Sequence, residues 1–160
     1  MITLVRCDDR LIHGQCVTTI IPKNGIKRVV AIDEYTATTP MMKKVFLAAA
    51  PKGVRVHVAT MEEAVPMLER SLADDVPTLV LMRFPELYEQ VLEKVPNMPK
   101  EYNIANAPPA DGRVQIASAC YLSQEQIASV KRMADAGVHI YFNLIPSQPT
   151  TEWDSIKSKY

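Results

Sequence analysis

The sequence predicts a single α/β domain, a three-layer sandwich in which helices cover a mainly parallel sheet of about seven strands. Short apolar runs rich in β-branched residues alternate with segments of helical period along nearly the whole chain, which is typical of such a sheet. The length of 160 residues suits one domain, so we expect residues 1–160 to form a single unit. Hydrophobic residues make up 48% and charged residues 22%, which excludes a disordered or fibrous chain.

Seven segments are predicted to be strands, because each is short, apolar and bounded by turn or helix signals. They are Ile2–Arg6, Arg28–Ile32, Val54–Val58, Thr78–Met82, Tyr102–Ala105, Arg113–Ile116 and Val138–Phe142. Helices with chemically marked ends lie between them, as expected where helices connect parallel strands.

The first of these helices is predicted to begin at Pro40, after the capping hydroxyl of Thr39, and to stop at Pro51. Its apolar residues recur at helical spacing and are expected to face the core. They are Met41, Met42, Val45, Phe46 and Ala49.

Two further helices carry the sequence pattern of a capping box at their start. Thr60 is followed by Glu63, and Ser123 by Gln126, so each hydroxyl has a partner three residues along the chain. The second helix ends at Gly137, which is suited to the left-handed backbone at a helix end.

Charge and hydropathy restrict the class of protein. Eighteen basic and eighteen acidic residues leave no net charge to attract nucleic acid or an anionic membrane surface. No apolar run approaches the roughly 18 residues that span a bilayer. The start, Met1–Arg6, lacks the basic-then-apolar order of a signal peptide. We therefore expect a cytoplasmic protein that does not bind nucleic acid.

The cysteines Cys7, Cys16 and Cys120 are odd in number and form no CxxC pair, so we expect reduced thiols. A zinc site made of Cys7, His13 and Cys16 would have unfamiliar ligand spacing and no evident fourth ligand. We expect no metal and no cofactor.

The loop after the first strand is the densest group of reactive side chains in the sequence. It runs from Cys7 to Gln15 and contains two aspartates, an arginine and a histidine. In an open parallel sheet, ligands bind beyond the carboxyl ends of the strands, where loops lead into helices. This loop is therefore the candidate functional site.

The residues of this loop suit phosphoryl transfer. A free imidazole is substantially neutral at pH 7, and a neutral ring nitrogen can attack phosphorus, which makes His13 a candidate nucleophile. The guanidinium of Arg10 fits phosphate oxygens, and the backbone N–H groups of Gly14 and Gln15, at the start of the next helix, could donate to them. The set is consistent with a phosphohistidine.

Two points stay open on the residues alone. Either Asp8 or Asp9 could fix the ring tautomer of His13 or hold Arg10 in place. The same cluster is explained at least as simply as a solvated loop held by side-chain hydrogen bonds. The other two histidines, at 57 and 139, fall inside predicted strands, and we expect them to be partly buried structural residues with a partner.

The run Asp8-Asp9-Arg10-Leu11-Ile12-His13-Gly14-Gln15 resembles the signature of a known family. It is similar to the IIB component of the mannose/fructose/sorbose branch of the bacterial phosphoenolpyruvate-dependent sugar phosphotransferase system (PTS). A weaker likeness continues to Gly137-Val138 and so covers most of the chain.

The resemblance implies an α/β fold and a protein-Npi-phosphohistidine–sugar phosphotransferase without a cofactor. His13 would accept a phosphoryl group from phosphorylated IIA and pass it to a sugar during uptake through the membrane components IIC and IID, to which the protein would be peripheral. Arg10 would be the principal phosphate-stabilising residue. The residues that would complete the site are Asp9, Gly14 and Gln15, framed by Arg6 and Asp8. The sequence fixes neither the sugar nor whether the chain forms a homo-oligomer.

This chain departs from the family pattern at three places. Cys16 replaces the usual valine, the Ile20-Ile21 region replaces a tryptophan, and Asn103–Ala107 lacks the glycines of the corresponding stretch. Because glycine permits close backbone approach and unusual torsions, the last change predicts a differently shaped segment and puts partner docking in question.

Two other functions remain open at the level of sequence. One is a non-catalytic regulatory or binding module that keeps the same fold, and the missing glycines favour it. The other is a small hydrolase or metal-dependent enzyme built on Cys7, His13 and Asp9.

Overall fold

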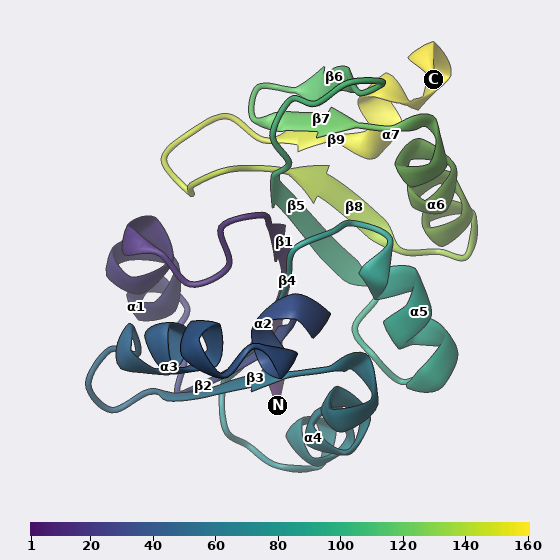
Figure 1. Ribbon diagram of the computed structural model, residues 1–160. Coiled ribbons are helices and arrows are strands. Elements are labelled where there is room, and N and C mark those ends of the chain that lie inside the picture. Colours follow the sequence, from purple (N-terminus) through teal and green to yellow (C-terminus); the bar gives the residue numbers. More distant parts are fainter.

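The computed structural model describes residues 1–160 and has helices on both faces of a central sheet (Figure 1). The sheet has seven strands in the order β3-β2-β4-β1-β5-β8-β9, and only β9 runs antiparallel to its neighbour. The predicted α/β fold with a mainly parallel, seven-stranded sheet is therefore confirmed. None of the helices combines the length and the apolar character needed to cross a membrane.

The strands of the sheet are β1 (Ile2–Asp8), β2 (Arg28–Ile32), β3 (Arg55–Ala59), β4 (Thr78–Met82), β5 (Glu101–Asn106), β8 (His139–Phe142) and β9 (Thr151–Glu152). A separate antiparallel pair consists of β6 (Val114–Ala117) and β7 (Cys120–Leu122). The helices are the π-helix η1 (Cys16–Ile20), α1 (Ile21–Lys23), α2 (Glu34–Thr38), α3 (Pro40–Ala48), α4 (Met61–Ala73), α5 (Leu87–Lys94), α6 (Gln124–Asp135), α7 (Trp153–Ile156) and the 3-10 turn η2 (Lys157–Lys159).

One predicted strand does not belong to the main sheet. The segment predicted over Arg113–Ile116 forms β6, which pairs only with β7 in the small second sheet. The seventh strand of the main sheet is β9, which has two residues and therefore no periodicity that the sequence could reveal. The other six predicted strands all lie in the main sheet.

The two faces of the sheet bury unequal amounts of apolar surface. Neighbouring residues on a strand point to opposite faces, so Val29 packs into one core and Val30 into the other. The larger core has 26 buried residues and lies under α4, α5 and α6, whereas the smaller has 11 and lies under η1 and α1. On the side of α1, no helix covers β5 and β8 (Figure 1).

Both predicted capping boxes are present. The Thr60 hydroxyl accepts from the backbone N–H of Glu63, whose carboxylate accepts from the backbone N–H of Thr60. Ser123 and Gln126 make the same reciprocal pair at the start of α6. Gly137 follows α6 with φ +87°, so the left-handed helix end is also confirmed.

The inward stripe predicted for the helix after Thr39 is wrong. The helix forms as α3, but Met41 is 76% and Val45 57% exposed, and only Met42 and Phe46 of the stripe are partly buried. Because α3 lies beside the edge strand β3, the sheet offers it a narrow surface that covers one side of the helix.

The two histidines outside the candidate loop are more exposed than the sequence predicts. His139 is in β8, with a side chain that is 54% exposed, and its Nε2 lies 2.7 Å from Glu152 Oε2. His57 lies exposed on β3 and makes no side-chain hydrogen bond. Both sit near the edges of the sheet, where strand residues face solvent.

Candidate functional site

The candidate loop lies where the central strand β1 ends. β1 pairs with β4 on one side and β5 on the other, and the chain then turns through Asp9 to His13. Helical backbone begins at Gly14 and continues to Lys23, with the π-helical turn of η1 in its middle. The predicted position at the carboxyl edge of the sheet is therefore found in the structure.

Asp8 is the hub of this loop. Its carboxylate is fully buried and accepts two hydrogen bonds from the Arg10 guanidinium, from Nε to Oδ1 and from Nη2 to Oδ2, each 3.0 Å long. The backbone N–H of Arg10 also donates to Oδ1, at 3.2 Å. The Nη2 group of Arg6 donates to the same Oδ2 at 3.2 Å. The half-buried Asp9 makes no side-chain hydrogen bond or ion pair. Of the two aspartates, Asp8 holds Arg10.

The imidazole of His13 lies against this group and has little contact with solvent. Its Nδ1 is 2.8 Å from the carbonyl oxygen of Leu11, and because a carbonyl only accepts, Nδ1 carries the proton. Nε2 is 3.8 Å from Asp8 Oδ2, is buried and has no hydrogen-bond partner. The side chain is 17% exposed. The ring must therefore turn before either nitrogen can meet a group on another protein.

Leu11 shapes the loop through its backbone. Its φ of +53° is the only left-handed value at a non-glycine residue in the chain, and the leucine side chain is fully buried. Such a backbone is strained for a bulky residue and persists because the surrounding packing holds it. This conformation places the Leu11 carbonyl against the ring of His13.

The start of the following helix faces open space. The first N–H groups of a helix have no acceptor within it, and the first helical bond here runs from Val17 N–H to the carbonyl of His13. Apart from its chain neighbours and the backbone of its own helix, no atom lies within 4 Å of the position that a Cβ on Gly14 would take. The side-chain oxygen of Gln15 accepts from Arg10 Nη1 at 3.3 Å. These groups surround a space that an oxyanion can enter.

Arg6 extends the network across the sheet. Its side chain is only 2% exposed, and Nη1 donates to Asn103 Oδ1 at 2.6 Å while Nη2 donates to the carbonyl of Leu144 at 2.7 Å. Burial lowers the pKa of Arg6, and the neighbouring Asp8 opposes this effect. Sequence reasoning missed Asn103, which reaches the site only because β5 pairs in register with β1.

The thiols near the loop are not reactive groups. Cys7 and Cys16 are buried, and burial raises the pKa of Cys16 to about 11 and that of Cys7 well above its ordinary value. A thiol rather than a thiolate is a weak nucleophile, so a hydrolase built on Cys7 is disfavoured. No group of three or more His, Cys, Asp or Glu side chains is placed to hold a metal ion.

The segment without the family's glycines is a regular strand end. Asn103–Ala107 runs from β5 into a bridge with Cys120, and none of its residues has a positive φ. The segment therefore adopts ordinary backbone torsions without glycine, and the difference in shape from the family stays a prediction.

Comparison with known proteins decides the family. The model of the sorbose-subfamily IIB component of the PTS matches residues 2–160. The chain belongs to this family. Relatives of this IIB component include the sorbose-specific EIIB component of Lacticaseibacillus casei, 24% identical over 95% of this chain and 92% of the relative. The fructose-specific EIIB component of Bacillus subtilis is 24% identical over 97% and 94%. The mannose-specific EIIAB component of Escherichia coli is 22% identical over 99% of this chain and 49% of its own length.

Solved structures agree with the fold of this IIB component. The IIBSor domain of the sorbose permease from Klebsiella pneumoniae superposes with a TM-score of 0.90, at 23% identity over 99% of this chain and 97% of that chain. The manxB structure from Thermoanaerobacter tengcongensis gives 0.87, at 25% identity over 100% and 96%. The resemblance inferred from the loop sequence is confirmed, and with it the general role of a phosphotransferase component in sugar transport.

Proposed function

We propose that this IIB component carries a phosphoryl group on His13, accepting it from a phosphohistidine of IIA and passing it to a sugar during uptake through IIC and IID. It would act in the cytoplasm, peripheral to the membrane. The observation that carries the proposal is the position of His13 beside the guanidinium of Arg10 and the open helix start at Gly14. The name of the EIIAB relative, which joins an A and a B component, supports IIA as the donor.

The transfer exchanges one nitrogen–phosphorus bond for another. The lone pair of a neutral His13 nitrogen attacks phosphorus, the bond to the donor imidazole breaks, and its electron pair returns to the donor nitrogen. The proton on the other nitrogen of the His13 ring stays on the ring. Nδ1 is hydrogen-bonded to the carbonyl oxygen of Leu11, and Nε2 is buried. We therefore expect docking of the donor to turn the His13 ring before the transfer takes place.

Two sets of donors suit the oxygens of the transferred group. Arg10 is 38% exposed and already fixed by Asp8, so its guanidinium lies ready at the surface without further ordering. The N–H groups of Gly14 and Gln15 lie at the start of the helix that follows. The single negative charge of Asp8 is shared by the guanidinium groups of Arg6 and Arg10. One positive charge of this pair is therefore left to interact with the phosphoryl group.

Phosphorylation of the purified protein tests this function directly. Incubation with phosphorylated IIA is expected to add one acid-labile phosphate, seen as a gain in mass, and a gene deletion is expected to stop uptake of one sugar. An unchanged mass with several cognate donors would refute the proposal. A deletion that leaves uptake intact but alters expression of a sugar operon would favour the regulatory module instead.

Arg10→Ala is expected to lower the initial rate of phosphoryl uptake on the order of 100-fold, because one charged donor to the phosphoryl oxygens is lost. Circular dichroism should show an unchanged fold, since the side chain is partly exposed. The control is Arg55→Ala, which removes an exposed arginine on β3, outside the site. Equal rates of phosphoryl uptake in the two variants would show that Arg10 does not stabilise the transferred phosphoryl group.

A further inference from the structure

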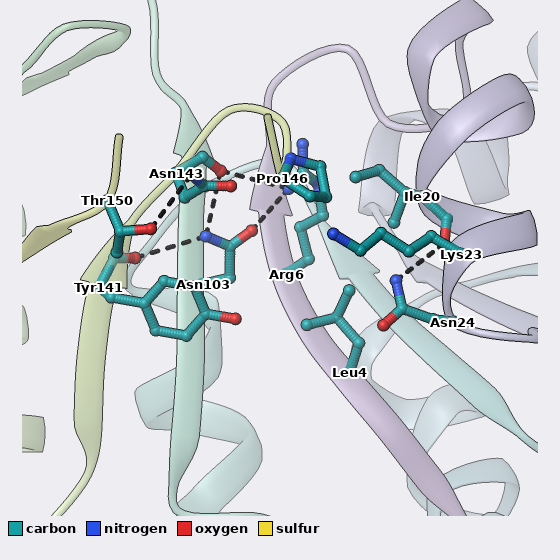
Figure 2. A pocket seen from close by; sticks show the side chains of 10 residues that line it. All are labelled: Leu4, Arg6, Ile20, Lys23, Asn24, Asn103, Tyr141, Asn143, Pro146 and Thr150. Carbon is teal, nitrogen blue, oxygen red and sulfur yellow. Dashed lines mark hydrogen bonds between the residues drawn. The ribbon is translucent and has the colours of Figure 1, made fainter. Parts of the chain in front are cut away.

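A polar pocket of about 300 Å³ lies beside Arg6, on the face of the sheet that η1 and α1 cover in part (Figure 2). Residues of β1, η1, α1, β5 and β8 line it, together with Asn24 after α1 and the segment that follows β8. Neither His13 nor Arg10 lines this pocket. It shares Arg6 and its partner Asn103 with the network around the His13 site.

The floor of the pocket is a row of polar side chains. Arg6 pairs in register with Asn103 on β5, which pairs with Tyr141 on β8, so the three residues are neighbours across three parallel strands. No helix covers this part of the sheet on the side of α1 (Figure 1). The segment from Asn143 to Thr150 lies there instead and closes one side of the pocket.

The lining carries positive charge without a balancing acid. Arg6 and Lys23 are its two charged residues, and Figure 2 shows the amino group of Lys23 pointing toward the strand that bears Arg6. Lys23 makes no ion pair or side-chain hydrogen bond within the chain. Two cations that face one space repel each other, and an anion between them would remove that repulsion.

The Arg6 guanidinium is incompletely paired within the chain. The carboxylate of Asp8 is shared between Arg6 and Arg10, so one negative charge serves two guanidinium groups. The Nε group of Arg6 is buried and has no hydrogen-bond partner, which is rare for a buried polar atom. A buried and incompletely compensated guanidinium gains from a second anion nearby.

The rest of the lining suits hydroxyl groups. The Tyr141 hydroxyl points into the pocket in Figure 2 and has no hydrogen-bond partner in the chain. The side-chain amide of Asn24 donates to the carbonyl of Ile20, which leaves its oxygen free to accept. The volume lies at the lower end of the range for small-molecule sites.

We propose that this pocket binds a small phosphate ester that also carries hydroxyl groups, such as a sugar phosphate, with the phosphate between Arg6 and Lys23. The hydroxyl groups of the ligand would contact Tyr141 and Asn24. Binding requires no phosphoryl transfer, so the proposal stands apart from the role of His13. A ligand in the pocket would contact Arg6, which is hydrogen-bonded to Asp8, and Asp8 in turn holds Arg10.

Isothermal titration calorimetry of the full chain at low salt tests the pocket with three probes: glucose 6-phosphate, inorganic phosphate and glucose. We expect glucose 6-phosphate to bind most tightly, inorganic phosphate more weakly, and glucose not measurably. Lys23→Gln should weaken binding of glucose 6-phosphate about tenfold, because one charge-assisted contact is lost. Tyr141→Phe should weaken binding of the ester and leave that of inorganic phosphate unchanged.

The matched control is Lys27→Gln, an exposed lysine four residues away that does not line the pocket. The proposed site would be wrong if both lysine variants lost affinity for glucose 6-phosphate equally. It would also be wrong if the wild type bound neither glucose 6-phosphate nor inorganic phosphate. Equal affinities for the ester and inorganic phosphate would overturn the ester part of the proposal. His13→Ala is expected to bind glucose 6-phosphate like the wild type, which separates this test from that of the phosphocarrier function.

Discussion

His13→Ala is expected to abolish phosphoryl acceptance completely, with no acid-labile phosphate detectable by mass spectrometry after incubation with phosphorylated IIA. The reason is chemical: the variant lacks the imidazole that lies beside the Asp8–Arg10 pair and the open helix start, and an acid-labile phosphate on nitrogen cannot form without it. The fold should persist, because the side chain makes a single hydrogen bond, to the carbonyl of Leu11.

The chain supplies its own controls for this result, since it has three histidines. His57→Ala and His139→Ala remove exposed imidazoles from β3 and β8, and both variants should accept phosphate like the wild type. Phosphate that persists in His13→Ala, or that disappears in one of the other two variants, would place the acceptor elsewhere.

Asp8→Ala is expected to lower the free energy of unfolding by about 3–5 kcal/mol, the typical cost of leaving a buried charge without its partner. The substitution removes the carboxylate that Arg6 and Arg10 share and leaves Arg6, which is 2% exposed, without a counter-ion. Urea unfolding followed by circular dichroism measures the loss. Phosphoryl transfer should fall as well, because the Arg10 guanidinium loses the two hydrogen bonds that fix it and the Arg10 backbone N–H loses a third.

Asp9→Ala is the matched control, because it removes the same charge one residue along the chain from a side chain without hydrogen bonds or ion pairs. Its unfolding free energy should stay within about 0.5 kcal/mol of the wild type. Adding Arg6→Met to Asp8→Ala should recover part of the lost stability, since the buried charge is then absent. Equal destabilisation by the two aspartate variants would show that Asp8 is not the hub.

The place of the site could be predicted from the sequence because its signals are local. A strand, a loop dense in charge and a helix start follow one another within the first 15 residues, and their order decides where they meet. The choice between Asp8 and Asp9 was open, although strand spacing points to an answer. Arg6 and Asp8 are two residues apart on β1 and therefore face the same side.

Other features depend on contacts between distant segments. Asn103 meets Arg6 through the register of β1 and β5, which no short run of sequence specifies. The strand β9 forms because β8 offers it an edge. The apolar spacing of α3 is helical, as expected, but its burial depends on how much of the sheet lies beneath it.

The two outer strands of the sheet differ from its interior in a way that bears on behaviour at high concentration. An unpaired strand edge is a template for another chain and so for aggregation, and charged residues or very short strands blunt it. β3 ends the sheet on one side with Arg55 and His57 exposed, and β9 ends it on the other with two residues. Neither border favours growth of the sheet from one molecule into the next.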